Sequence, residues 1–306
     1  MHHETLTIKV VGGCPVQADV YRPSGDAARP AIVWLHGGAL IFGSRDQINP
    51  AQRDLYLNAG YAVVAVGYRL APEARLPEIL EDIRDAMDWI RGDRARGLGI
   101  DPGRLAVVGH SAGGYLALMA GCLVRPSPQA LIAFYGYGDI VGEWYTHPDP
   151  FYCQQPLVPH AEAYAAVGGR PLSGVGGEDG ARRFRFYLYC RQRGLWPTEV
   201  VGHDPRIEPQ AFEPYCPLRN VTRGYPPTLL LHGDRDTDVP YAQSSLMAAE
   251  LARVGVAHEL VTIPGGEHGF DREMQNPIVA RAFDRVLSFL RVTLRDGRSA
   301  QPDPAE

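Results

Sequence analysis

A serine stands at the centre of a Gly-x-Ser-x-Gly motif, Gly109-His110-Ser111-Ala112-Gly113, near the middle of the chain. An apolar run, Leu105 to Val108, precedes the motif, and a small and aliphatic stretch, Tyr115 to Leu123, follows it. A strand that turns sharply into a helix at such a motif strains the serine backbone and leaves no room for side chains two positions before and after it. The hydroxyl then lies at the positive end of a helix. This position suits a nucleophile, and an ordinary glycine-rich turn is the alternative.

A nucleophilic serine needs a base to take its proton and an acid to orient that base. His268 is the candidate base, because it lies in a flexible loop, Pro264 to Phe270, directly after an apolar run. The candidate acids are Asp234, Asp236 and Asp238, in a loop that follows another apolar run. Carboxyl ends of parallel strands meet at one edge of a sheet, so these loops are expected to lie near Ser111.

Acyl transfer also needs donors for the negative charge that develops on the carbonyl oxygen. The predicted strand Ala31–Leu35 ends in His36-Gly37-Gly38-Ala39. Glycines at such a place let backbone N–H groups approach a ligand without obstruction by a Cβ atom. Gly37 and Gly38 are therefore candidate oxyanion donors.

The elements around these loops predict an α/β fold with a mostly parallel sheet covered by helices on both faces. An antiparallel hairpin, Thr5–Val10 with Val16–Tyr21, opens the chain. The strands expected after it are Ala31–Leu35, Ala62–Val66, Leu105–Val108, Leu131–Tyr135, Thr228–Leu231 and Glu259–Ile263. The expected helices are Asn49–Asn58, Ile79–Arg91, Ala112–Leu123, Tyr241–Val254 and Pro277–Leu294.

The segment 136–225 interrupts this alternation. It is rich in aromatic residues, prolines and arginines, contains a glycine-rich stretch at Val167–Gly180, and has one helical candidate, Arg182–Gln192. A structureless loop of this length is improbable inside a compact domain. We predict an inserted cap at 136–225 between two parts of one core, 1–135 and 226–294, with a disordered tail at 295–306.

Composition excludes several classes of protein. The 306 residues carry a formal net charge of −5, with 45% hydrophobic and 21% charged residues, so neither a nucleic-acid partner nor a membrane partner is expected. The five cysteines are odd in number and form no C-x-x-C pair, which argues against a structural zinc site and favours a reduced, cytoplasmic protein. A single disulfide among Cys153, Cys190 and Cys216 stays open, as does homo-oligomerisation.

Four blocks in order resemble the α/β-hydrolase superfamily, in the esterase group that carries an H-G-G oxyanion loop and includes hormone-sensitive-lipase-like enzymes and carboxylesterases. They are His36-Gly37-Gly38 with Gly43-Ser44, Tyr68 to Glu73, Gly109 to Gly114, and His232 to Pro240 with His268-Gly269-Phe270. The resemblance implies an α/β-hydrolase fold, with Ser111 as nucleophile, His268 as base and Asp236 as acid. It also implies an oxyanion hole formed by the backbone N–H groups of Gly37, Gly38 and Ala112.

The chain departs from that group in two places. Ala39 replaces a glycine, which we expect to change the wall of the acyl pocket. The sequence before His36 is also too short for the long N-terminal cap of the lipase branch, so any lid is expected to come from 136–225.

Several other residues have plain structural interpretations. Asp234 and Asp238 are expected in a solvated turn, and His36, His110 and His232 in structural or pocket-lining positions. Arg69 and Glu73 are expected to form ion pairs that brace loops, whereas Asp82 and Asp85 fit a solvated or helix-bracing face. The aromatic residues of the insertion are divided between a core of their own and a wall of the substrate pocket.

The expected function is hydrolysis of a small-molecule carboxylic ester with a short acyl chain, through an acyl-enzyme and without a metal or an organic cofactor. Amide hydrolysis with the same residues, as in an arylformamidase or an acylaminoacyl-peptidase, is one alternative. A non-catalytic ligand-binding protein on the same fold is another, although such proteins typically lose a triad member. The natural substrate and the mobility of the cap stay open.

Overall fold

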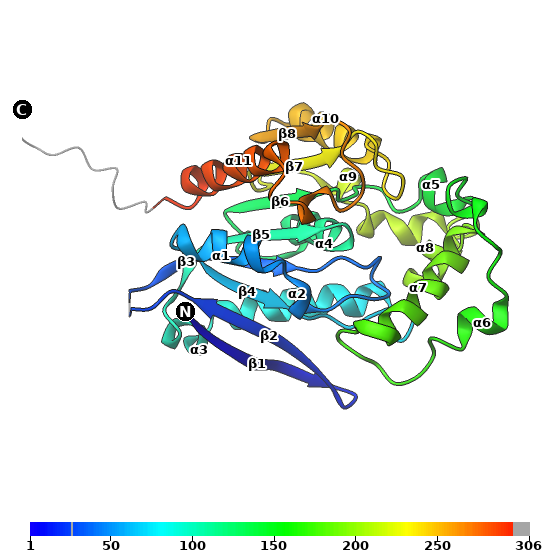
Figure 1. Ribbon diagram of the computed structural model, residues 1–306, viewed down its shortest axis with the longest axis horizontal. Coiled ribbons are helices and arrows are strands. Elements are labelled where there is room, and N and C mark those ends of the chain that lie inside the picture. The colour runs from blue at the N-terminus through cyan, green and yellow to red at the C-terminus, as the bar shows by residue number, and fades with distance from the viewer. Residues whose placement is uncertain (26, 296–306) are drawn as a thin grey trace, which may run out of the picture.

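The computed structural model describes residues 1–25 and 27–295, which form one eight-stranded sheet with helices on both faces (Figure 1). The strand order is β1-β2-β4-β3-β5-β6-β7-β8. Strands β1 and β2 are antiparallel to each other, β2 is antiparallel to β4, and all later pairs are parallel. The strands are β1 (His2–Val11), β2 (Cys14–Arg22), β3 (Arg29–Leu35), β4 (Ala62–Val66), β5 (Ile100–His110), β6 (Ala130–Phe134), β7 (Thr228–Gly233) and β8 (His258–Ile263).

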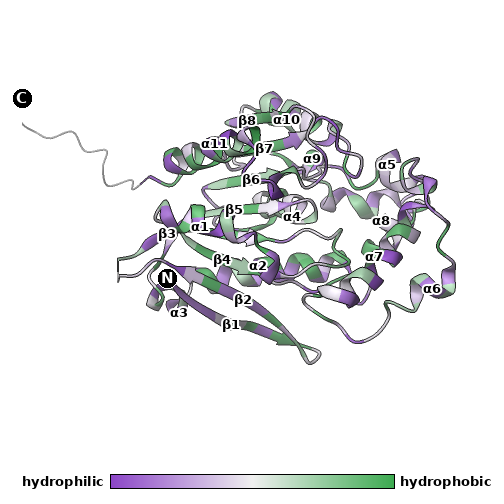
Figure 2. Cartoon of the chain, in the orientation of Figure 1, coloured by the Kyte–Doolittle hydropathy of each residue, from purple (hydrophilic) through white to green (hydrophobic). Residues whose placement is uncertain are grey.

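The inner strands β3 to β7 contain buried apolar runs because helices cover both faces of the sheet. Along β3, Ala31, Val33 and Leu35 belong to one core layer, whereas Ile32 and Trp34 belong to the other. Figure 2 shows the inner strands mostly in the hydrophobic colour, whereas the edge strand β1 mixes hydrophobic and hydrophilic residues. The sequence prediction of a mostly parallel, doubly covered sheet is confirmed.

Helices α1 (Pro50–Asn58) and α11 (Pro277–Thr293) pack on one face of the sheet, and α2 (Leu76–Arg91), α4 (Ala112–Leu123) and α10 (Ala242–Val254) pack on the other. A short helix, α3 (Asp93–Gly97), follows α2. Each long helix that the sequence predicted is present, with ends that differ by at most a few residues. None of the helices in the described part of the chain combines the length and the apolar character that a membrane span requires.

The segment between β6 and β7 forms the helices α5 (Glu143–Thr146), α6 (His160–Tyr164), α7 (Gly177–Arg191), α8 (Trp196–Val201) and α9 (Pro217–Asn220). In Figure 1, α5 to α8 gather at the end of the sheet toward which β4 and β5 point. Tyr145, Phe186 and Trp196 are buried in the same hydrophobic cluster as residues of α2 and α4. The insertion therefore shares its core with the sheet domain, and the exact domain boundaries stay a prediction. The predicted disordered tail, apart from Arg295, lies outside the described residues.

The motif residues Arg69 and Glu73 form separate ion pairs, as the bracing interpretation predicted. Arg69 contacts Asp82 at 2.9 Å, and Glu73 contacts Arg183 of α7 at 2.7 Å. Asp82 is fully buried, so the expectation of a solvated face is wrong at that position because Arg69 and Lys9 neutralise it inside the protein.

The Glu73–Arg183 pair joins the insertion to the sheet domain, and both side chains are almost inaccessible. Burial alone would raise the pKa of Glu73, but the hydrogen bonds and the charge of Arg183 outweigh it and lower that pKa below its ordinary value of 4.5. A carboxyl with a lowered pKa in the folded state stabilises the protein above its unfolded pKa. This contribution is lost as pH falls below about 4.5 through the lowered folded value.

We expect Glu73→Gln to lower the free energy of unfolding by about 3–5 kcal/mol at neutral pH, because it leaves the Arg183 guanidinium buried without its counter-charge. Urea unfolding followed by circular dichroism measures the change. Glu178→Gln is the matched control, because Glu178 lies on the same helix as Arg183 but is almost fully exposed. Equal stability of the two variants would refute a structural role for the buried pair.

Candidate active site

Ser111 occupies a sharp turn between β5 and α4, with φ of 55° and ψ of −119°. Its N–H group donates a hydrogen bond to the carbonyl of Phe134 at the end of β6, at 2.9 Å. The turn is compact because a Cβ on Gly109 would lie 1.9 Å from the Gly113 carbonyl oxygen. A Cβ on Gly113 would lie 2.1 Å from the Leu35 carbonyl oxygen, so this glycine lets α4 approach the end of β3. The prediction that both flanking glycines are sterically required is confirmed.

His268 and Asp236 complete a hydrogen-bonded chain with Ser111. The Ser111 hydroxyl lies 3.0 Å from His268 Nε2, and His268 Nδ1 lies 2.8 Å from Asp236 Oδ2. The register of the strands explains why these three residues meet. At the ends of the parallel strands, Leu35 pairs with Gly109, Phe134 with Leu231, and Gly233 with Ile263. The loops that follow these strands therefore meet at one edge.

Asp236 is fully buried and fixed by four donors. Its Oδ1 accepts the backbone N–H groups of Asp238 and Val239, each at 2.9 Å. Its Oδ2 lies 2.8 Å from His268 Nδ1 and 3.3 Å from His232 Nε2. Burial alone would raise the pKa of Asp236, but the hydrogen bonds from His232 and His268 hold it well below its usual range. The carboxylate is thus ionised at neutral pH and orients the imidazole of His268.

Charges around His268 raise its basicity. Burial alone would lower the pKa of His268, but the attraction of Asp238 and the hydrogen bond with Asp236 outweigh it and raise that pKa above 6.5. Neutral imidazole is the form that can take a proton from Ser111. The fraction of this form therefore grows as pH rises through a value above 6.5.

The H-G-G loop lies directly beside the serine. A Cβ on Gly37 would be 3.3 Å from the Ser111 Cβ atom, and Gly38 has a φ of +106°. Within residues 1–25 and 27–295, no acceptor is bonded to the backbone N–H groups of Gly37, Gly38 and Ala112. They are free to bind a ligand oxygen. Ala39 replaces the usual glycine and adopts a φ of 54°, a conformation that an alanine rarely takes.

His36 supports this loop, as the structural interpretation of that residue predicted. Its ring stacks on Tyr68, with centroids 4.1 Å apart, and the Tyr68 hydroxyl donates to the His36 carbonyl at 2.7 Å. Burial lowers the pKa of His36 to about 4, so the ring is neutral. His232 is also structural, because it bridges Ser244, Val239 and Asp236.

A second buried network lies behind the serine and joins His110, for which a structural or pocket-lining position was expected, to residues that the sequence did not single out. His110 Nδ1 lies 3.1 Å from Asp271 Oδ2, and the Tyr135 hydroxyl donates to the same carboxylate. Gln52 contacts the other ring nitrogen of His110 at 3.0 Å. Asp271 follows His268 by three residues, so this network connects the histidine loop to the serine turn. Its only sequence signal is the position of Asp271 after the His-Gly-Phe block.

Asp238 contradicts the solvated-turn expectation. Its side chain is only 18% exposed, and its Oδ2 lies 3.4 Å from His268 Nε2. Asp234 fits that expectation, since it is exposed and accepts the Gly265 N–H at 2.7 Å. The difference arises because side chains of the insertion cover Asp238 but do not reach Asp234.

A cavity of about 670 Å³ opens above Ser111, within the usual range for small-molecule sites. Its aromatic walls come from the sheet domain and from the insertion: Trp34, Phe42, Tyr135, Tyr152, Phe184 and Tyr187. Phe184 and Tyr187 belong to α7, whereas other aromatic residues of the insertion are in the core. The aromatics are divided between core and pocket wall as expected, but the buried ones join the core of the sheet domain and form no core of their own.

The remaining chemistry-bearing residues of the described chain form no further site of this kind. In these residues, no cluster of three His, Cys, Asp or Glu side chains is arranged to hold a metal ion. Cys153, Cys190 and Cys216 are free thiols, which answers the open question about a disulfide among them.

Known proteins resemble this chain in sequence and in fold. The BD-FAE family model matches residues 18–136, and the model of the prolyl oligopeptidase family matches residues 188–296. An ethyl acetate hydrolase of Pseudomonas putida is 31% identical over 275 residues, which are 87% of this chain and 75% of that enzyme. The crystal structure of EstE1, a thermophilic carboxylesterase cloned from a metagenomic library, superposes with a TM-score of 0.69 and 26% identity over 96% of this chain and 90% of EstE1.

Larger relatives contain a similar region. The non-reducing polyketide synthase pkbA of Emericella nidulans is 29% identical over 324 residues, which are 88% of this chain but only 13% of the synthase. The chain thus spans about an eighth of the length of the first curated relatives that it matches.

The parallel sheet, the strained serine turn and the loops that meet beside it define an α/β-hydrolase. Together with the comparisons, they show that the chain belongs to the α/β-hydrolase superfamily, in the family that includes the Pseudomonas putida enzyme.

Proposed function

We propose that this protein hydrolyses carboxylic esters of short acyl chains by way of an acyl-enzyme formed on Ser111. The hydrogen-bonded chain from Ser111 through His268 to Asp236 is the observation that carries the proposal. Its order and geometry are those of a nucleophile, a base and an orienting acid.

In the proposed reaction, Ser111 Oγ attacks the acyl carbonyl carbon while His268 Nε2 takes the hydroxyl proton. The carbonyl oxygen becomes an oxyanion, and the N–H groups of Gly37, Gly38 and Ala112 stabilise it. The ester C–O bond then breaks, and the departing alcohol receives the proton from His268. Water attacks the acyl-enzyme by the same route, which releases the carboxylic acid and restores Ser111.

The walls of the cavity support a preference for short acyl chains. Its wall includes α7, which is fixed to the sheet domain by the buried Glu73–Arg183 pair. In the described residues between β6 and β7, α7 is the longest helix, and its surface carries several arginines and acidic residues rather than an aliphatic face. An enzyme that opens on a lipid surface needs an amphipathic apolar helix for this purpose.

We expect kcat/KM for p-nitrophenyl esters to be highest between acetate and hexanoate and to fall at least about 100-fold at palmitate, because aromatic side chains and the fixed helix α7 bound the cavity above Ser111. Initial rates below the micelle concentration measure this preference. The matching p-nitroanilide and formamide substrates, run beside the series, separate esterase from amidase activity. A maximum at palmitate with a rate increase above the micelle concentration would contradict the proposal.

A further inference from the structure

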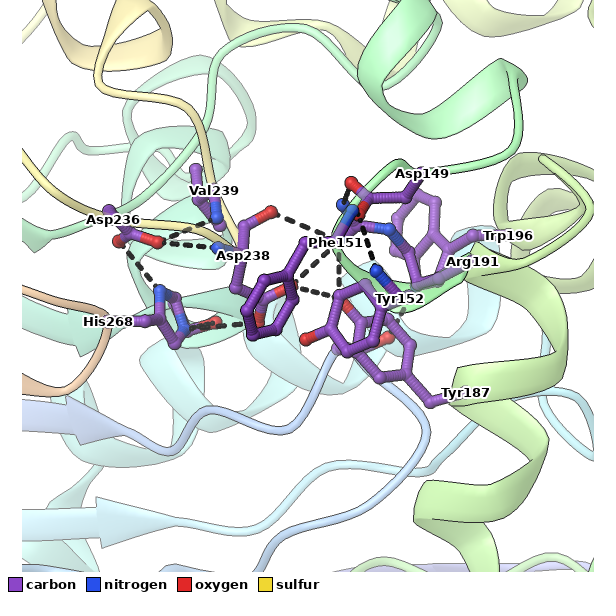
Figure 3. Close-up of polar contacts among 12 residues, drawn as sticks. Asp149, Phe151, Tyr152, Tyr187, Arg191, Trp196, Asp236, Asp238, Val239 and His268 are labelled. Carbon is purple, nitrogen blue, oxygen red and sulfur yellow. Dashed lines mark hydrogen bonds and ion pairs between the residues drawn. The ribbon is translucent and has the colours of Figure 1, made fainter. Parts of the chain in front are cut away.

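A second carboxylate lies beside Nε2 of His268, the ring nitrogen that faces Ser111. Asp236 faces Nδ1, the far nitrogen, whereas Asp238 Oδ2 lies 3.4 Å from Nε2, the nitrogen that faces Ser111. Figure 3 shows the imidazole of His268 between these two carboxylates, which come from the same loop. A serine, a histidine and one acid are sufficient for the proposed chemistry, so the position of Asp238 needs its own explanation.

Side chains of the insertion determine the orientation of the Asp238 carboxylate. Its Oδ1 accepts hydrogen bonds from the Tyr187 hydroxyl at 2.5 Å and from Arg191 at 2.7 Å, and both donors lie on α7. Arg191 also donates to the Asp238 backbone carbonyl at 3.1 Å. Because both donors bind Oδ1, Oδ2 is left to face His268 and the cavity.

Arg191 is itself held from several sides. It is 1% exposed, and its other terminal nitrogen donates to Asp149. Its guanidinium lies 4.9 Å from the ring centre of Tyr152 and 5.0 Å from that of Tyr145. One positive charge is therefore shared between two carboxylates, Asp149 and Asp238. The pair of carboxylates retains a net negative charge, and Asp238 carries part of it beside His268.

The other groups that face His268 do not supply the same effect at Nε2. Ser111 is neutral, and the neutral ring of Tyr135 lies 4.6 Å from the imidazole. Asp236 acts on the opposite nitrogen, and the charge of Arg272 lowers the pKa of His268 slightly. Among residues 1–25 and 27–295, Asp238 is the carboxylate that lies beside the nitrogen that carries the transferred proton.

We propose that Asp238 is a positioning residue that stabilises the His268 imidazolium at Nε2, and that Arg191 of the insertion fixes Asp238 for this task. The inference rests on the proposed function of Ser111 and His268. The proton from Ser111 Oγ stays on Nε2 and is attracted to Asp238 Oδ2 until the departing alcohol takes it. Asp238 gains no proton and forms no covalent bond.

The pKa of His268 is the measurement that tests this inference. NMR titration of the histidine ring protons in Ser111→Ala protein gives this pKa without turnover, and a His268→Gln variant assigns the resonance. We expect Asp238→Asn to lower the pKa by about one unit, because it removes an opposite charge within 4 Å. The acid limb of kcat/KM in the enzyme that retains Ser111 should move down by the same amount.

Asp234→Asn is the matched control, because it removes the same charge from the same loop at an exposed position that faces Gly265. We expect it to change the pKa of His268 by less than about 0.2 units. An Asp238→Asn protein that folds and keeps the parent pKa of His268 would overturn the proposal.

Should that variant fail to fold, Tyr187→Phe provides the second test, because it removes one hydrogen-bond donor from Asp238 and leaves the aromatic ring. The pKa should then rise, and a fall or no change would refute the inference. Activity in the Ser111→Ala protein would instead refute the proposed function, so the two failures are distinguishable.

Discussion

Replacement of Ser111 by alanine is expected to reduce kcat for p-nitrophenyl butyrate by about 10⁴- to 10⁶-fold, because a nucleophile and its base act as a unit. The hydroxyl lies 3.0 Å from His268 Nε2, and in the described part of the chain no other hydroxyl contacts that nitrogen. The residual rate would come from the oxyanion donors and from substrate binding alone. Stopped-flow or steady-state release of p-nitrophenol measures the loss.

Labelling with a fluorophosphonate should disappear in the same variant, because that reagent forms its bond with the activated serine. Ser173→Ala is the control, since Ser173 carries a partly exposed hydroxyl that donates to the Pro15 carbonyl. It should keep both labelling and turnover. A folded Ser111→Ala protein with turnover close to that of the parent would show that another residue is the nucleophile.

Replacement of Asp236 by asparagine is expected to lower kcat by about 10³- to 10⁴-fold while the protein stays folded. Asp236 Oδ1 accepts the N–H groups of Asp238 and Val239, so the new amide oxygen is expected to occupy that side. The amide nitrogen would then face His268 Nδ1 and favour the tautomer that cannot accept the Ser111 proton at Nε2. The hydrolysis rate of the same ester, measured beside a thermal unfolding curve, provides the test.

Asp234→Asn should change kcat by less than about threefold, because an asparagine oxygen can still accept the Gly265 N–H and the side chain is exposed. Asp234→Asn and Asp236→Asn each remove one carboxylate charge from the same loop, so the total charge of the two variants is equal. Equal and mild losses in the two variants would mean that the orienting acid lies elsewhere.

The sheet and the central residues of the site could be predicted because their signals are local. Short apolar runs marked the inner strands, and the glycines around Ser111 marked a turn that allows no Cβ. Strand order along a parallel sheet then brought the later loops to the same edge. The positions of His268 and Asp236 could thus be predicted without knowledge of tertiary contacts beyond that rule.

The role of Asp238 could not be predicted in this way. Its environment depends on Arg191, 47 positions earlier on α7, and the helical candidate Arg182–Gln192 gave no indication of the loop that this helix contacts. The sequence placed Asp238 in a polar turn, which describes its backbone but not the side chains that cover it. Asp271 was missed for a similar reason, because its partner His110 ends β5 and its partner Tyr135 directly follows β6.

The contacts of the insertion have a consequence for protein engineering. Trp196 donates to the Ala39 carbonyl in the oxyanion loop, Arg183 pairs with Glu73, and Arg191 binds Asp238 beside the histidine. Residues 136–225 therefore cannot be transferred between hydrolases as an independent unit. A chimera that receives this segment on another hydrolase core would need partners equivalent to Ala39, Glu73 and Asp238. Directed evolution of substrate range is thus better aimed at the cavity face of α7, at Phe184, than at exchange of the whole segment.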